Sequence, residues 1–447
     1  MSSVESPSRV ESPSSVESLG ALERRLNASI PQQQLKGEVE ARLKHLGRTA
    51  KAPGFRPGKV PLNILRQQYG AQMQQEAIGD ALQKYFAEAV TANKLRVASR
   101  PDFEIKSIDP TTEQIEFSAT FEVYPEVVLG DVAAQTVERA IYSMSEADVD
   151  RTISTLLKQR AVFVVSDRAA QNEDQVTIDF SGTLDGELFE GGQAKDFKVV
   201  LGLGRMLSDF EAGIIGMKAG ETKSFDVNFP AEYHGKNVAG KRTVFTITLH
   251  LVESPRLPEL NAEFAKSMGI NDGDVEKLRA EIRKNIGLEV ERRLKLRNKD
   301  NAMDVLFNVV QMDVPKAMVE AEAQALMQQT LDEMKQRGTS MPGMTLPLHL
   351  FSERAHRRVK LGLILIDLVE RHNLGATPEQ TRTLLLEYAQ SFDHPDEVVK
   401  WHYNNPERLR EVENMVLEEN VVAWVMNTAK VSEKDVDFNE LMGNKNG

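Results

Sequence analysis

The sequence predicts a multi-domain α+β protein in which parts of different secondary-structure class follow one another. Its 447 residues are enough for two to four domains. Residues 172–253 alternate apolar and polar side chains, which is typical of a half-buried sheet. From Pro255 onward apolar residues recur at helical spacing to near the end, and residues 19–130 mix the two patterns. We therefore expect an N-terminal α+β domain, a small antiparallel β-sheet domain and an extended all-α C-terminal body.

The composition is that of a globular protein without cysteine chemistry. Hydrophobic residues make up 41% of the chain and charged residues 27%. Cysteine is absent, which excludes disulfides, thiolate catalysis and thiolate metal sites. No apolar run approaches the ~20 residues that span a bilayer, and the N-terminus lacks the apolar segment of a signal peptide. We expect a cytoplasmic protein with no membrane partner.

The N-terminal stretch "MSSVESPSRVESPSSVES" is rich in serine, proline and glutamate, and it repeats the motif "VESPS". A segment of this composition buries too little apolar surface to offset the entropy lost on ordering. Residues 1–18 are therefore expected to be a disordered tail.

The N-terminal α+β domain is predicted from local patterning. Residues 22–30 alternate as a strand, and residues 35–50 place leucine and valine on one helix face. Residues 61–95 indicate two further helical stretches, and residues 103–109 and 115–127 return to strand patterning. The segment "APGFRPGKVP" (52–61) thus connects two helices at a sharp corner.

This segment, which we call the Phe55 loop, has an unusual composition. Its prolines cannot continue a helix and fix φ, and its glycines permit tight reversal, so we expect a stiff, exposed tip. In one interpretation Phe55 packs on its own domain and the nearby cations are solvated. In the other, Phe55 is an interface anchor flanked by Arg56 and Lys59, which pair with phosphate or carboxylate. Residues 36–66 carry eight cations and two carboxylates in a chain of net charge −12, which indicates a targeted anionic partner.

The β-rich part is expected to contain four strands and one short helix. The strands are predicted at residues 175–184, 195–202, 222–229 and 242–253, with the helix in between at 208–221. The last strand should place Phe245, Ile247, Leu249 and Leu251 on one face. Asp185 and Gly186 supply a turn.

The helical parts carry clear start signals. Ser145 and Asp148 form a capping box before a periodic run at 146–160. After Pro255 several predicted helices have proline at or near their first turn.

The Phe55 loop resembles the ribosome-docking signature of the trigger factor family, the bacterial chaperones of the nascent-chain exit tunnel. The family pattern G-F-R-x-G-K-x-P is complete here, and it assigns ribosome binding to six residues: Gly54, Phe55, Arg56, Gly58, Lys59 and Pro61. The resemblance covers residues 19–443.

The β-rich part resembles an FKBP-type prolyl isomerase, whose motifs follow in the family order without large insertions. The resemblance implies a substrate cleft lined by Phe180, Phe189, Glu190, Phe197, Met206, Leu207, Phe210, Tyr233 and Phe245. Phe210 stands where FKBPs often have tryptophan, so the floor of the cleft is smaller. The alternative is that these aromatic residues are simply the core of a β-domain.

Together the resemblances imply an ATP-independent chaperone that binds nascent chains and isomerises X-Pro bonds. They imply a disordered tail (1–18), a ribosome-binding α+β domain (19–130), a linker and helix joining the body (131–168), an isomerase domain (169–254) and a helical chaperone domain (255–447) with arms. The implied partners are the large ribosomal subunit, through exit-tunnel protein and rRNA, and unfolded polypeptides. A homodimer off the ribosome is left open, and no cofactor is expected.

Two other interpretations belong to different classes of protein. In the first, the chain is a stand-alone prolyl isomerase whose helical part only dimerises. In the second, the basic segment binds RNA, against which the net charge of −12 argues. No metal site is expected: His349 and His356 lie seven residues apart without a nearby ligand cluster.

Overall fold

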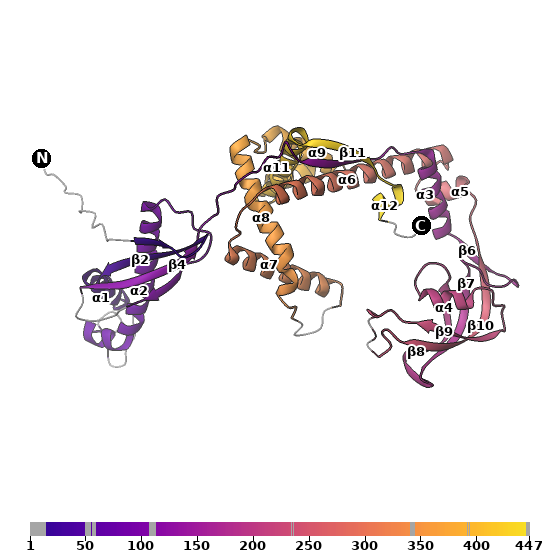
Figure 1. The fold of residues 1–447 in the computed structure, drawn as a ribbon, viewed down its shortest axis with the longest axis horizontal. Coiled ribbons are helices and arrows are strands. Elements are labelled where there is room, and N and C mark those ends of the chain that lie inside the picture. The colour runs from indigo at the N-terminus through magenta and orange to yellow at the C-terminus, as the bar shows by residue number, and fades with distance from the viewer. Residues whose placement is uncertain are drawn as a thin grey trace. The chain divides into compact units, whose positions relative to one another are not determined.

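The computed structural model describes residues 15–49, 55, 60–106, 113–233, 235, 237–339, 345–390, 392 and 394–443. The chain divides into two compact units, each of which is discontinuous in sequence. One unit combines residues 1–139 with 297–434, and the other combines 140–296 with 435–447. Together they hold the mixture of sheets and helices that the sequence predicts (Figure 1).

The first unit begins with a four-stranded antiparallel sheet in the order β1-β2-β4-β3. The strands are β1 (Ser15–Ser18), β2 (Glu23–Pro31), β3 (Asp102–Ile105) and β4 (Gln114–Glu122). Helices α1 (Gln32–Leu46) and α2 (Leu62–Ala92) pack beside it (Figure 1). In the core between them, the ring of Phe86 meets those of Phe103 and Phe121 edge-on, with centroids 5.7 and 5.0 Å apart.

Two expectations for this region are wrong. Ser15–Ser18 are not disordered, since they pair with β2 and Val16 packs against the core; residues 1–14 lie outside the described part. The composition of the tail does not reveal that an open strand edge is available for pairing. The two helices expected at 61–95 are one helix, α2, because its buried face runs continuously from Leu65 to Ala89 across two glycines.

The helical part of the first unit is built on long helices. These are α6 (Val275–Val309), of which residues 297–309 belong to this unit, α7 (Lys316–Gln336), α8 (His349–His372), α9 (Pro378–Ala389), α10 (Pro395–Tyr403) and α11 (Pro406–Thr428). Proline occupies the first turn of α9, α10 and α11, as the sequence indicates.

The core of this helical part includes residues from the segment after β4, which the sequence pattern did not predict. Side chains from α6, α8 and α11 pack around Val127 and Val132, which come from the segment after β4. Two strands, β5 (Thr136–Ile141) and β11 (Lys430–Asp435), form a short ladder that the sequence analysis missed. The burial pattern of β11 shows why, since all six of its residues are exposed and no alternation marks the strand.

The second unit contains a five-stranded antiparallel sheet. Its strands are β6 (Val162–Val165), β7 (Gln175–Leu184), β8 (Glu187–Val200), β9 (Thr222–Asn228) and β10 (Arg242–Arg256). Strand β10 pairs with β6, β7 and β9, and β7 also pairs with β8. Helix α4 (Ser208–Ile214) lies beside this sheet (Figure 1). Its residues Phe210 and Ile214 are buried in the core. Strand β6 was not predicted.

One face assignment in β10 is wrong. Phe245, Ile247 and Leu249 point into the core as expected, but Leu251 does not, and Val252 is buried instead. The register of β10 against β7 shifts between Leu249 and Leu251, so His250 is an extra residue. Such a bulge inverts the inward and outward positions that follow it.

A separate core holds the other helices of the second unit. It joins α3 (Glu146–Gln159), α5 (Ala262–Ser267), the first part of α6 and α12 (Phe438–Met442). Val149 and Ile153 of α3 belong to this cluster and not to the core of the five-stranded sheet.

Candidate functional site

The five-stranded sheet and α4 bring most of the predicted cleft residues together. Phe210 and Phe245 are buried in the core, and six other predicted residues pack on it while staying partly exposed: Phe180, Phe189, Phe197, Met206, Leu207 and Tyr233. The ninth, Glu190, lies in β8, and its side chain is outside the described part. The positions that are far apart in the sequence therefore form one aromatic site.

The aromatic rings of this site meet edge to face. The ring of Phe180 lies 5.6 Å from those of Phe197 and Phe210, and the ring of Phe210 lies 5.3 Å from that of Phe245. In this arrangement the positive ring edges meet negative ring faces, which stabilises a cluster of aromatic residues.

Two glycines allow the rings to lie directly on the strands. A Cβ atom at Gly182 would lie 2.7 Å from Cζ of Phe245 and 2.9 Å from Cε1 of Phe189. A Cβ atom at Gly192 would lie 2.9 Å from Cζ of Phe189. Any side chain at Gly182 would therefore push two cleft rings out of place.

The turn before α4 is held by a buried carboxylate. Glu211 is only 7% exposed. Its Oε2 accepts a hydrogen bond from the Gly202 N–H at 2.9 Å, and its Oε1 accepts one from the Met206 N–H at 3.4 Å. This places Leu207 at the N-terminus of α4 with extended backbone. In the described residues, the N–H of Leu207 makes no hydrogen bond, so it is free for a ligand.

The sequence analysis missed two aromatic residues of this cluster, Phe225 and Phe229. Phe225 lies 6.3 Å from Phe210, and Phe229 lies 4.7 Å from Tyr233, measured between ring centroids. Both lie on or next to β9, where Phe225, Val227 and Phe229 face the core and alternate with the polar Asp226 and Asn228. This alternation in "TKSFDVNF" is the signal that would have found them.

A small apolar cluster joins α1, α2 and the residue Val60 that leads into α2. Leu43, Val60, Leu65 and Met73 are buried there, and Pro61 precedes the first turn of α2. Phe55 itself is 41% exposed. Gly54, Arg56, Gly58 and Lys59 lie outside the described residues. The structure thus does not bury Phe55 in its own domain.

The basic segment carries less free charge than its composition suggests. Arg42 forms an ion pair with Asp80 at 2.6 Å, and Arg66 forms one with Glu40 at 2.9 Å. Counting charges in the segment misses Asp80, which α2 supplies from outside it.

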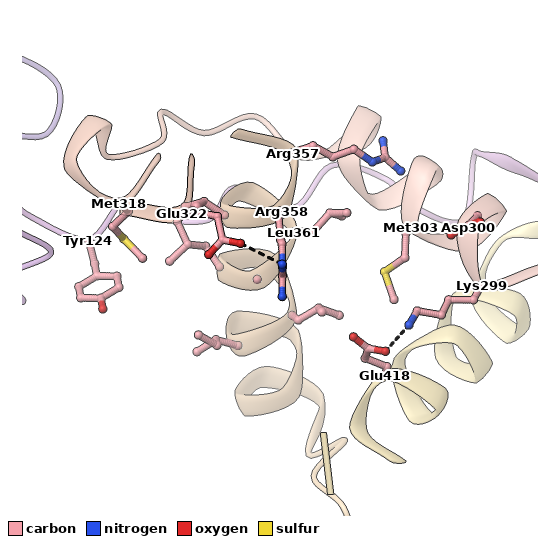
Figure 2. Close-up of a pocket in the computed structure, with 15 residues that line it drawn as sticks. Tyr124, Lys299, Asp300, Met303, Met318, Glu322, Arg357, Arg358, Leu361 and Glu418 are labelled. Atoms are coloured by element: carbon pink, nitrogen blue, oxygen red, sulfur yellow. Dashed lines mark hydrogen bonds and ion pairs between the residues drawn. The ribbon is translucent and has the colours of Figure 1, made fainter. Parts of the chain in front are cut away.

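The helical part of the first unit contains a cavity of about 500 Å³ (Figure 2). Apolar side chains from α6, α7 and α8 line it, among them Met303, Met318 and Leu361, and Tyr124 lies at one side. Ion pairs between Lys299 and Glu418 and between Arg358 and Glu322 lie along the cavity. This mixture of apolar and charged lining suits an extended peptide better than a small apolar ligand.

The folds and the aromatic site define a class of protein, a peptidyl-prolyl isomerase domain joined to α+β and helical domains. Family models agree with this division. Residues 13–156 match the bacterial trigger factor protein, 166–250 match the FKBP-type peptidyl-prolyl cis-trans isomerase, and 274–427 match the C-terminus of the bacterial trigger factor protein.

Curated relatives match over nearly the whole chain. The trigger factor of Nitrosospira multiformis is 51% identical over 426 residues, which is 95% of this chain and 98% of that protein. The trigger factor of Laribacter hongkongensis is 50% identical over 428 residues, with the same coverage. A solved structure from work on promiscuous substrate recognition by the trigger factor chaperone covers 93% of this chain, at 16% identity and a TM-score of 0.45.

The chain therefore belongs to the trigger factor family. It is a ribosome-associated chaperone that carries a peptidyl-prolyl cis-trans isomerase domain. The matches on both sides of the isomerase domain argue against a stand-alone isomerase. No helix in the described ranges has the length and apolarity that a membrane crossing requires.

Proposed function

We propose that the Phe55 loop is the ribosome-docking element of this chaperone, at the exit tunnel of the large subunit. The exposure of Phe55 carries this proposal, because interface anchors are often aromatic and a ring at the surface can reach a partner. Val60 is buried against Leu43 of α1 and Leu65 of α2. Arg56 and Lys59 would then pair with ribosomal carboxylate and rRNA phosphate.

Cosedimentation with ribosomes tests the docking proposal. The combined change Phe55→Ala, Arg56→Ala and Lys59→Ala should abolish cosedimentation and leave peptide isomerisation intact. Arg42→Ala is the matched control, because Arg42 is already paired with Asp80 and is not free to bind a partner. Ribosome binding by the triple variant at wild-type strength would contradict the assignment.

The aromatic cleft is proposed as the site of prolyl isomerisation. The barrier of ~18–20 kcal/mol is the lost resonance of the amide bond. Twisting this bond weakens the amide dipole, so a site of aromatic rings solvates the planar ground state poorly and the twisted state better. This is differential binding in favour of the transition state, and it requires no nucleophile. The N–H of Leu207, which makes no hydrogen bond within the described residues, would bind a substrate carbonyl, and the ring of Tyr233 would contact the substrate proline.

A proline-containing peptide substrate tests the cleft. Phe197→Ala or Tyr233→Ala should lower kcat/KM for isomerisation at least tenfold and spare suppression of aggregation. Leu188→Ala is the control, since Leu188 lies on the same strand as Phe197 but is 60% exposed. An equal loss of both activities would refute the division of labour.

The cavity between α6, α7 and α8 is proposed as part of the surface that binds unfolded chains. Its methionines are flexible and adapt to varied sequences.

Dimerisation away from the ribosome and a cytoplasmic location stay predictions, which sedimentation velocity and cell fractionation would check.

A further inference from the structure

We propose that Asp179, Asp196 and His250 form a site for a single divalent transition-metal ion, of the chemical class of Zn²⁺, on the outer face of the isomerase sheet. The three residues come from three neighbouring strands, β7, β8 and β10. One ligand atom from each lies within 4.8 Å of the others. No part of the isomerase mechanism above uses them.

The geometry of the site is close to that of a metal centre. Nε2 of His250 lies 3.0 Å from Oδ2 of Asp179. Two ligand atoms bound tetrahedrally to one Zn²⁺ lie about 3.4 Å apart, given Zn–N and Zn–O bonds of about 2.0–2.2 Å. A small outward movement of the imidazole therefore makes room for an ion between these two atoms.

Two β-bulges, one in each neighbouring strand, bring the outer ligands to Asp179. His250 is the extra residue where β10 shifts register against β7. On the other side, β8 shifts register opposite Asp179, between the pairs Ile178/Phe197 and Phe180/Ala194. Asp196 lies in this second bulge with φ of 49°, and its N–H donates to Oδ1 of Asp179 at 2.7 Å. Bulges re-aim side chains, and here both direct them to the same point.

The ligand set and the charge suit a borderline divalent cation. One imidazole nitrogen with two carboxylate oxygens favours Zn²⁺ or Ni²⁺ over Mg²⁺ or Ca²⁺, which prefer oxygen alone. Two carboxylates balance the charge of a divalent ion. Lys195 is close enough to Asp179 to interact with it electrostatically, so its positive charge would compete with the ion.

The site lies directly behind the isomerase cleft. Asp179 and Asp196 precede Phe180 and Phe197 in the chain, and the rings of Phe180 and Phe197 are in contact on the other face. A bound ion would join β7, β8 and β10 behind this pair of rings. No residue spacing in the sequence indicates such a site, because Asp179 and His250 are 71 residues apart and each ligand lies on a different strand.

Calorimetric titration of the chelator-treated full chain with zinc chloride tests the proposal. We expect one zinc ion per chain, with affinity reduced at least tenfold by His250→Gln and by Asp196→Asn. Asparagine retains the left-handed backbone tolerance of aspartate, so Asp196→Asn removes charge without forcing the bulge to refold. The chain lacks cysteine, so no thiolate competes for the ion.

His349→Gln is the matched control, because His349 is an exposed histidine on α8 that is far from Asp179 in sequence and lies in the other unit. It should leave zinc affinity unchanged. NMR spectra of the labelled chain should show zinc-dependent shifts at His250 and Asp196. Unchanged zinc affinity in His250→Gln, or zinc-dependent shifts confined to other histidines, would overturn the proposal.

Discussion

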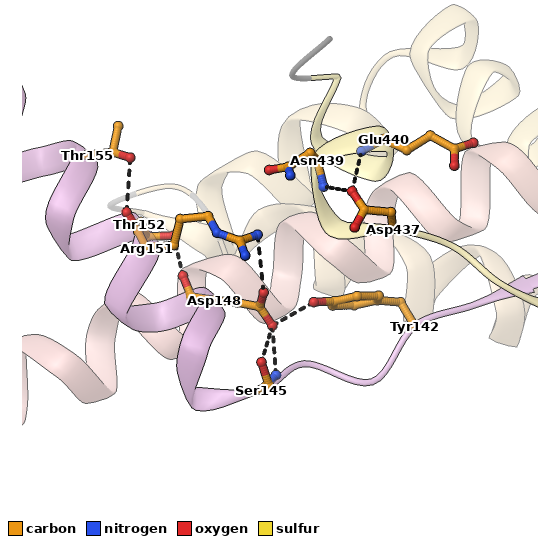
Figure 3. A network of polar contacts seen from close by, with 9 residues as sticks. All are labelled: Tyr142, Ser145, Asp148, Arg151, Thr152, Thr155, Asp437, Asn439 and Glu440. Atoms are coloured by element: carbon orange, nitrogen blue, oxygen red, sulfur yellow. Dashed lines mark hydrogen bonds and ion pairs between the residues drawn. The ribbon is translucent and has the colours of Figure 1, made fainter. Parts of the chain in front are cut away.

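At the scale of single residues, Asp148 shows how one buried carboxylate can fix the start of a helix (Figure 3). It is 4% exposed. Its Oδ2 accepts hydrogen bonds from the Tyr142 hydroxyl at 2.6 Å and from both the N–H and the hydroxyl of Ser145 at 2.8 Å. Burial alone raises the pKa of Asp148, but the hydrogen bonds from Tyr142 and Ser145 outweigh it and leave this pKa below its ordinary value.

Asp148→Ala should therefore lower the free energy of unfolding of the second unit by about 2 kcal/mol, because a cap is lost and Tyr142 loses its acceptor. Differential scanning calorimetry of the full chain measures this as a lower transition temperature. Because the folded pKa is depressed, the contribution of Asp148 is present above the unfolded pKa of about 3.9 and is lost as pH falls through the folded pKa. If the difference in the free energy of unfolding between the wild type and Asp148→Ala grew as pH fell below 4, this account would be contradicted.

Gly182→Ala is a second prediction at this scale. The added Cβ would collide with the rings of Phe245 and Phe189, neither of which can move without disturbing the cleft. We expect kcat/KM for peptide isomerisation to fall at least tenfold, with a loss of about 1–3 kcal/mol in stability from overpacking. Gly37→Ala is the control, since nothing lies within 4 Å of its added Cβ on α1. A Gly182→Ala chain with wild-type isomerase kinetics would show that the rings adapt freely.

At the scale of elements, local patterning predicted most strands and helices but not the places where strands change register. Spacing alone predicts the capping box at Ser145 and the prolines that begin α9 to α11. It also predicts the inward faces of β7 and of the first half of β10. Spacing does not predict the bulge at His250, because an extra residue can be recognised only when the pairing with the partner strand is known. Leu251 was misassigned for this reason.

The strand β1 gives a prediction at the same scale. Its four residues cover the edge of β2 from Arg24 to Asn27, so removing residues 1–18 should expose that edge. We expect faster amide hydrogen exchange in this part of β2, by about tenfold or more, since its protection depends on the pairing. Removal of residues 1–14 alone is the control and should leave the exchange unchanged. Equal exchange in both deletions would mean that β1 adds no protection in solution.

At the scale of the whole molecule, the sequence indicated the order of the parts but not which distant segments share a core. Three motif-bearing regions were identified in the right order, and the family models match them in that order. The compact units are discontinuous, because segments distant in the chain share one core, as Val127 and Val132 do with α8 and α11. Such long-range packing leaves no local periodic signal. The clustering of the aromatic residues was predicted, but Phe225 and Phe229 were missed although their alternation with polar residues in "TKSFDVNF" could have indicated them.

The last prediction concerns the independence of the two proposed activities. Phe55 belongs to the first unit, whereas the aromatic residues of the proposed cleft belong to the core of the five-stranded sheet in the second unit. Sites without shared contacts usually have additive mutational effects. A chain that combines Tyr233→Ala with the triple alanine change of the Phe55 loop should lose ribosome cosedimentation as the triple variant does, and isomerase activity as Tyr233→Ala does. Isomerase activity on a free peptide that falls further in the combined variant than in Tyr233→Ala would show that the loop and the cleft are coupled through the fold.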